Sequence, residues 1–196
     1  MNLLRLTIFL ALACAGVAQA TPITYLYSGS GTGSLGDVSF TNAEFLITAQ
    51  ADTSNITPWV NASFGPQNTH LSAKIDISGL GVHTINTPSH TWAVPDGSLG
   101  GLGENGYVNW VTLSGGQLSG YGLDTTFGPV TDPAPTHVEQ FHSVLTTGGV
   151  LQFTNISTIT FEAILVPEPT AMLSAATVGL IGCLWIRNGV RNRFNS

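Results

Sequence analysis

The sequence of 196 residues predicts an all-β fold, an antiparallel β-sandwich of jelly-roll type, followed by a single C-terminal transmembrane helix. Three observations lead to the β prediction. Apolar and polar residues alternate in short segments, as in strands that bury one face. Glycine, proline, asparagine and aspartate are concentrated between these segments, where turns are expected. No sustained helical stripe occurs between residues 21 and 166, so the helical crossovers of a parallel sheet are not predicted.

Two segments show the alternation most clearly, residues 71–78 and 158–165, where apolar residues recur at every second position. Both are predicted as strands with one buried face, and residues 151–165 are the best candidate for a hairpin or a pair of strands. Further strands are expected at 22–28, 38–51, 81–86, 90–94, 106–113, 117–120, 139–146 and 150–155. Turns are expected at 52–55, 86–89, 95–106, 114–116, 128–135 and 147–149.

Residues 21–165 are predicted to form one domain. This region contains no cysteine, because Cys14 and Cys183 lie in the two terminal segments. A packed apolar core must therefore stabilise the domain without a disulfide. The first expected strand begins almost at residue 21 and the last ends near Leu165, so we expect both ends of the domain to be tied into the sheets.

The first twenty residues have the features of a secretory signal peptide. Arg5 precedes an apolar run over residues 6–15, and small residues at Ala18 and Ala20 form a cleavage site. The mature chain is expected to start after Ala20. Lipidation of Cys14 is the alternative, but the residue three positions before it is not the large apolar one that such a site requires.

The carboxyl end has the features of a membrane segment. Residues 170–186 are uncharged and mostly apolar, and as a helix they would rise about 25 Å, slightly less than a hydrocarbon core of about 30 Å. Pro167 and Pro169 would define the start of that helix. Arg187, Arg191 and Arg193 follow it, so the charge distribution predicts that both ends are cytoplasmic and that residues 21–166 are translocated. A buried core helix is the alternative interpretation.

Residues 166–196 resemble a known sorting signal. The segment Val166-Pro167-Glu168-Pro169, the apolar span and the arginine-rich end are similar to the PEP-CTERM tail of exported proteins in Gram-negative bacteria. The resemblance implies that the secretion machinery exports the chain, and that an exosortase, a membrane-embedded enzyme, recognises the tail and cuts near the Pro-Glu-Pro triplet. The precursor would be anchored in the inner membrane and then delivered to the cell surface or the medium. A stiff linker before a permanent anchor is the alternative.

The charge of the expected domain excludes some partners. Residues 21–166 contain ten Asp or Glu and one Lys, which gives a formal charge of −9 with neutral histidines. Such a domain should repel nucleic acid and anionic surfaces.

Three patterns in the sequence bear on a possible cofactor or metal site. Residues 31–36 have the glycine spacing of a dinucleotide-binding loop, but a strand is expected after them instead of the required helix, so they predict a hairpin or bulge. His137, Glu139 and His142 carry zinc-binding groups, but on a strand His142 would point away from the other two. Asp52, Asp96, Asp124 and Asp132 lie in expected loops, where they could bind calcium or cap turns. No nucleophile elbow and no exported cysteine is present, so no catalytic residue, metal or cofactor is predicted.

The leading functional hypothesis is a non-enzymatic cell-surface or extracellular-matrix protein, associated with exopolysaccharide. A carbohydrate-binding module is the first alternative, with Trp59 and Tyr121 as glycan-stacking residues, because both lie beside turn residues and are the aromatic residues most expected to be exposed. A secreted glycoside or ester hydrolase that uses a pair of acids is the second alternative.

Overall fold

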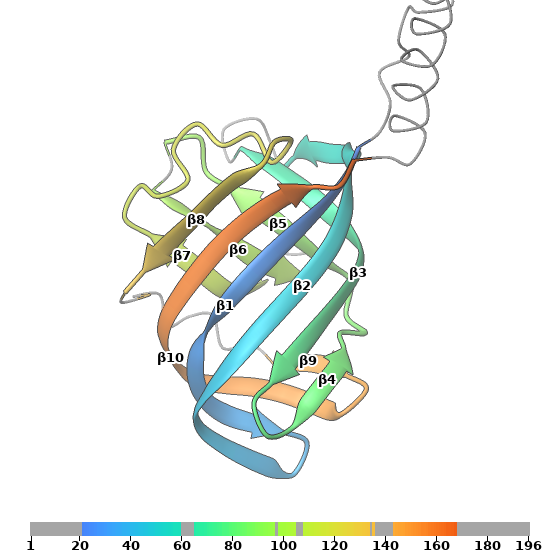
Figure 1. Ribbon diagram of the computed structural model, residues 1–196, viewed down its shortest axis with the longest axis vertical. Helices are drawn as coiled ribbons and strands as arrows, with labels where there is room; N and C mark the ends of the chain where they lie inside the picture. Colours follow the sequence, from blue (N-terminus) through green and yellow to red (C-terminus); the bar gives the residue numbers. More distant parts are fainter. Residues whose placement is uncertain are drawn as a thin grey trace, which may run out of the picture.

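The computed structural model describes residues 21–59, 65–96, 98–104, 108–133, 135 and 143–167. They form ten strands, all paired antiparallel, which confirms the all-β prediction (Figure 1). The strands are β1 (Pro22–Leu35), β2 (Val38–Pro58), β3 (Pro66–Ile77), β4 (Gly81–Thr84), β5 (Ser89–Ala93), β6 (Leu99–Glu104), β7 (Val108–Ser114), β8 (Phe127–Asp132), β9 (Val144–Thr146) and β10 (Gly149–Leu165).

The strands form one continuous sheet that curls into a nearly closed barrel. Its order is β7-β6-β5-β3-β2-β1-β10-β8, and its two edges meet where Ser114 at the end of β7 donates hydrogen bonds from N and Oγ to Asp132 Oδ2 of β8, each 2.8 Å long. The predicted division into two packed sheets is therefore wrong. Alternation could not distinguish the two architectures, because a sandwich and a curled sheet both bury one face of every strand.

The short strands β4 and β9 close a second, smaller ring. β4 pairs with β3 and β9 pairs with β10, and the two segments are joined by backbone hydrogen bonds from Asn86 N to Leu145 O (2.8 Å) and from Thr147 N to Thr84 O (3.0 Å). The ring β1-β2-β3-β4-β9-β10 lies at the lower end of the molecule in Figure 1. β1, β2, β3 and β10 thus belong to both rings.

The long strands can serve both rings because they bend. The register of β1 against β10 shifts after Ser30 and again after Thr32, and such bulges bend a strand and increase its twist. Gly29 lies just before the first shift, and a Cβ there would be 2.1 Å from the carbonyl oxygen of Thr158, so only glycine permits this approach of β1 to β10. Residues 31–36 continue β1 to the turn at Gly36, which confirms the predicted bulge and hairpin.

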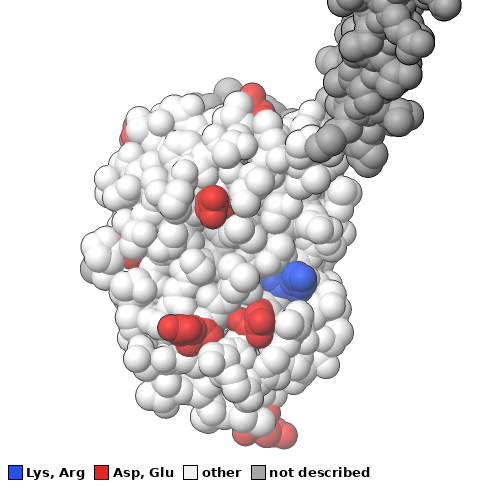
Figure 2. All heavy atoms as spheres, in the orientation of Figure 1, with Lys and Arg blue, Asp and Glu red and all other residues white. Residues whose placement is uncertain are grey.

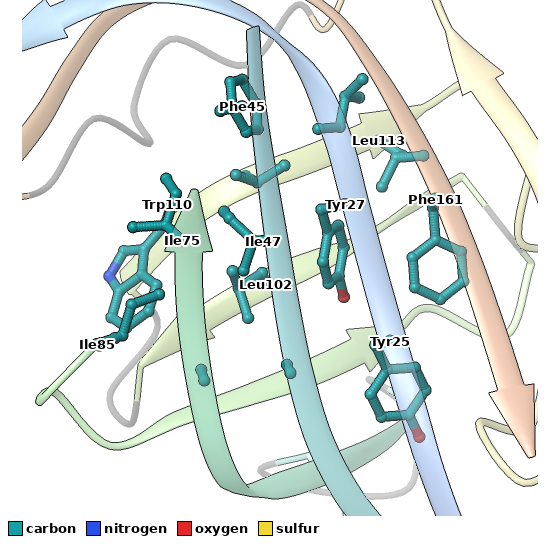
Figure 3. Packing of buried hydrophobic residues seen from close by; sticks show 14 of the residues in the cluster. Tyr25, Tyr27, Phe45, Ile47, Ile75, Ile85, Leu102, Trp110, Leu113 and Phe161 are labelled. Atoms are coloured by element: carbon teal, nitrogen blue, oxygen red, sulfur yellow. The ribbon is translucent and has the colours of Figure 1, made fainter. Parts of the chain in front are cut away.

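The inner faces of the strands form the apolar core. Tyr25 and Tyr27 of β1, Ile47 of β2, Ile75 of β3 and Phe161 of β10 are at most 2 % exposed and point to one side of the sheet (Figure 3). Burying an aliphatic or aromatic side chain of this size contributes about 1.5–3 kcal/mol. This one-sided burial leaves the outer faces of β1, β2, β3 and β10 mostly to polar residues, with five exposed large apolar exceptions: Val38, Leu46, Leu71, Val150 and Ile164.

Several predicted elements are wrong. Residues 95–106 were expected as a turn but contain β6, whose glycines hide the alternation; a Cβ at Gly101 would be 2.0 Å from the carbonyl oxygen of Val111. Residues 128–135 were also expected as a turn, yet most of them belong to β8, an edge strand that tolerates Pro129. Residues 117–120, expected as a strand, form turns, and 149–165 form one strand instead of two.

The two ends of the domain are both tied into the sheet, as predicted, and they lie side by side. Ile23 pairs with Leu165, and Val166 N donates a 2.8 Å hydrogen bond to Pro22 O. The chain therefore enters and leaves the sheet at the same end of the barrel, opposite the ring closed by β4 and β9 (Figure 1).

Candidate functional site

A hollow of about 640 Å³ lies on the outer face of the four central strands, β10, β1, β2 and β3. Eight side chains line it in two parallel rows. The first row consists of Thr160, Ser28, Leu46 and Asp76, in strand order. The second consists of Thr158, Ser30, Glu44 and Ser78, the last residue lying directly after β3 and bonded through its N–H to the carbonyl oxygen of Glu44.

The register of the sheet gives this array its dimensions. Neighbouring strands are about 4.8 Å apart, so four strands span about 14 Å, and rows two residues apart are separated by about 7 Å. Between the rows, Gly29 of β1 and Phe45 of β2 turn inward, so their backbones form the floor. The bulges that bend β1 and β10 begin at this level, which makes the outer surface concave here.

The polar groups of the hollow have few partners within the protein. Thr160 Oγ1 is 2.8 Å from Thr131 Oγ1, whereas within the described chain the hydroxyls of Ser28, Ser30, Ser78 and Thr158 make no side-chain hydrogen bond. Glu44 and Asp76 are exposed and, among the described residues, take part in no ion pair. Figure 2 shows this face, with separated acidic groups and one basic group among uncharged atoms.

Glu44 and Asp76 occupy diagonal positions, because Asp76 faces Leu46, two residues beyond Glu44 on β2. Diagonal neighbours in an antiparallel pair are about 7–8 Å apart at Cα. A separation of this order is compatible with the acid pair of a glycoside hydrolase, but the general acid of such an enzyme must be desolvated to hold its proton. Both carboxylates are exposed, so neither has the desolvated surroundings that such an acid requires.

A second polar cluster lies inside the barrel, where a chain of hydrogen bonds links four side chains. Tyr27 Oη donates to Gly101 O (3.1 Å) and is 2.8 Å from Thr91 Oγ1, so Thr91 must donate its own proton to Tyr27. Thr91 Oγ1 then accepts from Nε2–H of His70 at 2.9 Å. The remaining ring nitrogen, Nδ1, accepts from Ser89 Oγ at 2.8 Å. The network therefore fixes one neutral tautomer of His70.

The contact between Ser89 and His70 has the form of a nucleophile and its base. Ser89 is only 5 % exposed, however, and burial, with a smaller contribution from His90, lowers the pKa of His70 to about 3. Such an imidazole accepts a proton poorly at neutral pH. The cluster is accordingly a structural network that satisfies polar groups within the barrel.

The proposed stacking residues Trp59 and Tyr121 are not exposed, which corrects the prediction. Trp59 is 8 % exposed, and its ring packs on Trp92 with a centroid separation of 4.7 Å. Tyr121 is 6 % exposed; it stacks on Phe127 at 4.4 Å and donates a 2.9 Å hydrogen bond to Thr125 O. Aromatic residues beside turns fold back over the sheet here, because burying their area is favourable.

His90 lies next to Trp59, on the face of β5 opposite to Thr91. It is 1 % exposed, its ring is 6.2 Å from that of Trp59, and burial lowers its pKa to about 4. Neither of its ring nitrogens has a hydrogen-bond partner in the part of the chain that the structure describes. A buried polar atom without a partner costs about 1–3 kcal/mol, so this position is a point of low stability.

Some of the other candidate residues lie within the described part of the chain and some lie outside it. Asp96 accepts a hydrogen bond from Ser98 N and caps a turn. Asp52 accepts one from Ser54 N but lies within β2, where a turn was expected at 52–55, and Asp132 lies in β8. No group of three potential metal ligands occurs among the described residues. His137, Glu139 and His142, which carry zinc-binding groups but were not predicted to form a metal site, lie outside them.

Val166 and Pro167 are described and exposed, directly after β10. The other terminal predictions lie outside the described residues: Ala18, Ala20, Glu168, Pro169, residues 170–186, Arg187, Arg191 and Arg193. Within the described ranges, no helix has the length and apolar character needed to cross a membrane.

Comparison with protein-family models, with curated proteins and with solved structures finds no match to this chain. Function is therefore inferred from its own residues. The sequence did not single out the hollow. Its only signal was polar residues at alternate positions of four segments, which become neighbours only through long-range strand pairing.

Proposed function

We propose that this chain is a non-enzymatic surface protein, exported across the inner membrane, held there briefly by its carboxyl-terminal segment and processed by an exosortase. The resemblance of residues 166–196 to a PEP-CTERM tail motivates the proposal. Released protein would remain at the cell surface or in the extracellular matrix, in association with exopolysaccharide.

The observation that supports this proposal most is the position of the domain's last residue. β10 ends at Leu165, and Val166 is held against Pro22 by its backbone hydrogen bond. The Pro-Glu-Pro triplet starts at the next residue, Pro167, which is exposed. A processing enzyme could therefore reach Pro167, the first residue of the triplet, without unfolding the sheet, and a cut after the triplet would leave every strand pair of the described residues intact.

The acidic domain agrees with this role. With a formal charge of −9 over residues 21–166, it stays soluble and avoids anionic surfaces once it is released. An aqueous compartment is suitable for a fold whose outer strand faces are polar, and oxidising conditions do no harm to a domain without cysteine.

The test is the mass of the protein in cells of a Gram-negative host that has an exosortase and in the matched deletion strain. We expect a shortened chain ending near residue 169 in the first strain and an intact carboxyl end in the second. A variant with Pro167→Ala and Pro169→Ala should remain uncut, whereas Asp37→Asn, in a distant turn, should be processed normally. An intact tail in both strains would refute the processing step.

A further inference from the structure

We propose that the hollow on the outer face of β10, β1, β2 and β3 binds a saccharide that carries free amino groups. The hollow is made by two registered rows of side chains on the central strands, not by loops. Strand positions are rigid, so the polar groups are arranged before a ligand arrives and little entropy is lost on binding.

The hydrogen-bonding groups of the hollow match those of a saccharide. The four hydroxyls without side-chain partners each can donate and accept, as sugar hydroxyls do. Leu46 lies between them, 40 % exposed, and offers an apolar contact for the carbon side of a sugar ring. An area of about 14 Å by 7 Å is elongated along one row and suits a linear segment of a chain.

The charge of the hollow selects among saccharides. Glu44 and Asp76 are carboxylates that can only accept hydrogen bonds, and both lie at the β2–β3 side of the array. Lys74, also exposed on β3, is the only cationic residue of residues 21–166 and does not line the hollow. Ammonium groups would form charge-assisted hydrogen bonds there, whereas uronic acids would be repelled.

This inference is independent of tail processing, because it concerns binding by the folded sheet. The extracellular location proposed above only explains how such a polymer would be met. Binding is measured on the purified chain, and processing is measured by mass in cells, so either proposal can fail alone.

The experiment compares three probes on the full-length chain purified in mild detergent: a glucosamine oligomer, its N-acetylated counterpart and an oligogalacturonate. The first two share the ring and differ in the charge on the amino group. Titration calorimetry at slightly acidic pH, where amines are protonated and carboxylates ionised, should show the glucosamine oligomer binding at least about tenfold more tightly than the acetylated one. The oligogalacturonate should not bind.

The variants Glu44→Gln and Asp76→Asn keep the size of each side chain and remove its charge. Each should weaken glucosamine binding about fivefold or more and leave the unfolding midpoint unchanged, since both residues are exposed. Glu162→Gln and Asp37→Asn are matched controls outside the hollow and should bind as the wild type does. Equal binding of the two amino-sugar probes, no binding of either, or binding that survives both hollow variants would overturn the proposal.

Discussion

Acidification should destabilise this protein through two histidines that the fold withdraws from water, His90, which is buried, and His70, which is half-buried. Burial lowers the pKa of His70 to about 3 and that of His90 to about 4, against about 6.5 in the unfolded chain. Between those values the unfolded state binds more protons than the folded state. The contribution of these histidines to the free energy of unfolding is therefore fully present above pH 6.5. It is lost as the pH falls below 6.5, and the loss ends once the pH reaches the folded pKa values.

The size of this effect follows from the same values. At pH 5 each histidine is protonated in the unfolded chain but mostly neutral in the folded protein. Lowering the pH from 7 to 5 therefore reduces the free energy of unfolding by about 2 kcal/mol per ring and about 4 kcal/mol for both. Ordinary carboxylates titrate mostly below this range, so they contribute little. A loss of this size is a large part of the 5–15 kcal/mol that typically holds a domain folded.

The assay is urea unfolding of the wild type and of His90→Phe at pH 7 and pH 5. Phenylalanine keeps an aromatic ring against Trp59 and removes both unpartnered nitrogens, so the variant should lose about 2 kcal/mol less than the wild type on acidification. At pH 7 the variant should be at least as stable. An equal loss in both proteins would show that His90 titrates normally, and the reasoning from its burial would be refuted.

Three further substitutions test contacts of the sheet by chemical unfolding at neutral pH. Tyr27→Phe removes the hydroxyl that bonds Thr91 and should cost about 1–3 kcal/mol with an unchanged fold; no loss would show that the network adds nothing. Gly29→Ala places a methyl group against the carbonyl of Thr158 and should cost about 3 kcal/mol, so a neutral effect would contradict the close approach. Asp132→Ala leaves two donors at the sheet edges unpaired and should cost about 2 kcal/mol, measurable also as faster amide exchange in β7.

The fold class was predictable because local chemistry determines it. In residues 71–78 the alternation of small or branched apolar residues with polar ones is visible without any knowledge of partners. β3 buries Ala73, Ile75 and Ile77 as predicted, whereas Leu71 lies at a register shift between β2 and β3 and is 70 % exposed. β6 was not predictable, since Gly100, Gly101 and Gly103 carry no side chain that could alternate. Gly101 is required by the close approach of β7, and a Cβ at Gly100 would meet the side chain of Leu118; both contacts are properties of the fold and not of the segment.

The hollow shows the same limit for function. Ser28 was expected at the end of a strand, and Ser30, before the glycine-rich residues 31–36, was assigned to no strand and no turn, so neither was considered as a ligand-binding residue. Ser28 belongs to a row with Leu46, and Ser30 to a row with Glu44, only because of the register between β1 and β2, which the bulges and turns determine together. The aromatic candidate Trp59 failed for the opposite reason: adjacency to a turn says little about which way a large ring folds.

The pairing of Ile23 with Leu165 makes the domain a natural subject for circular permutation. A short glycine-serine connection could join these two strand ends, while new termini are opened in the turn between β3 and β4, where a Cβ at Gly79 would meet no neighbouring atom. Every hydrogen-bonded ladder would survive, but the exit point of the chain would move from one pole of the barrel to the other. If the permuted protein were attached to a surface through its new terminus, the hollow would face that surface in the opposite orientation. The effect of the hollow's orientation could then be measured without changing the residues that form it.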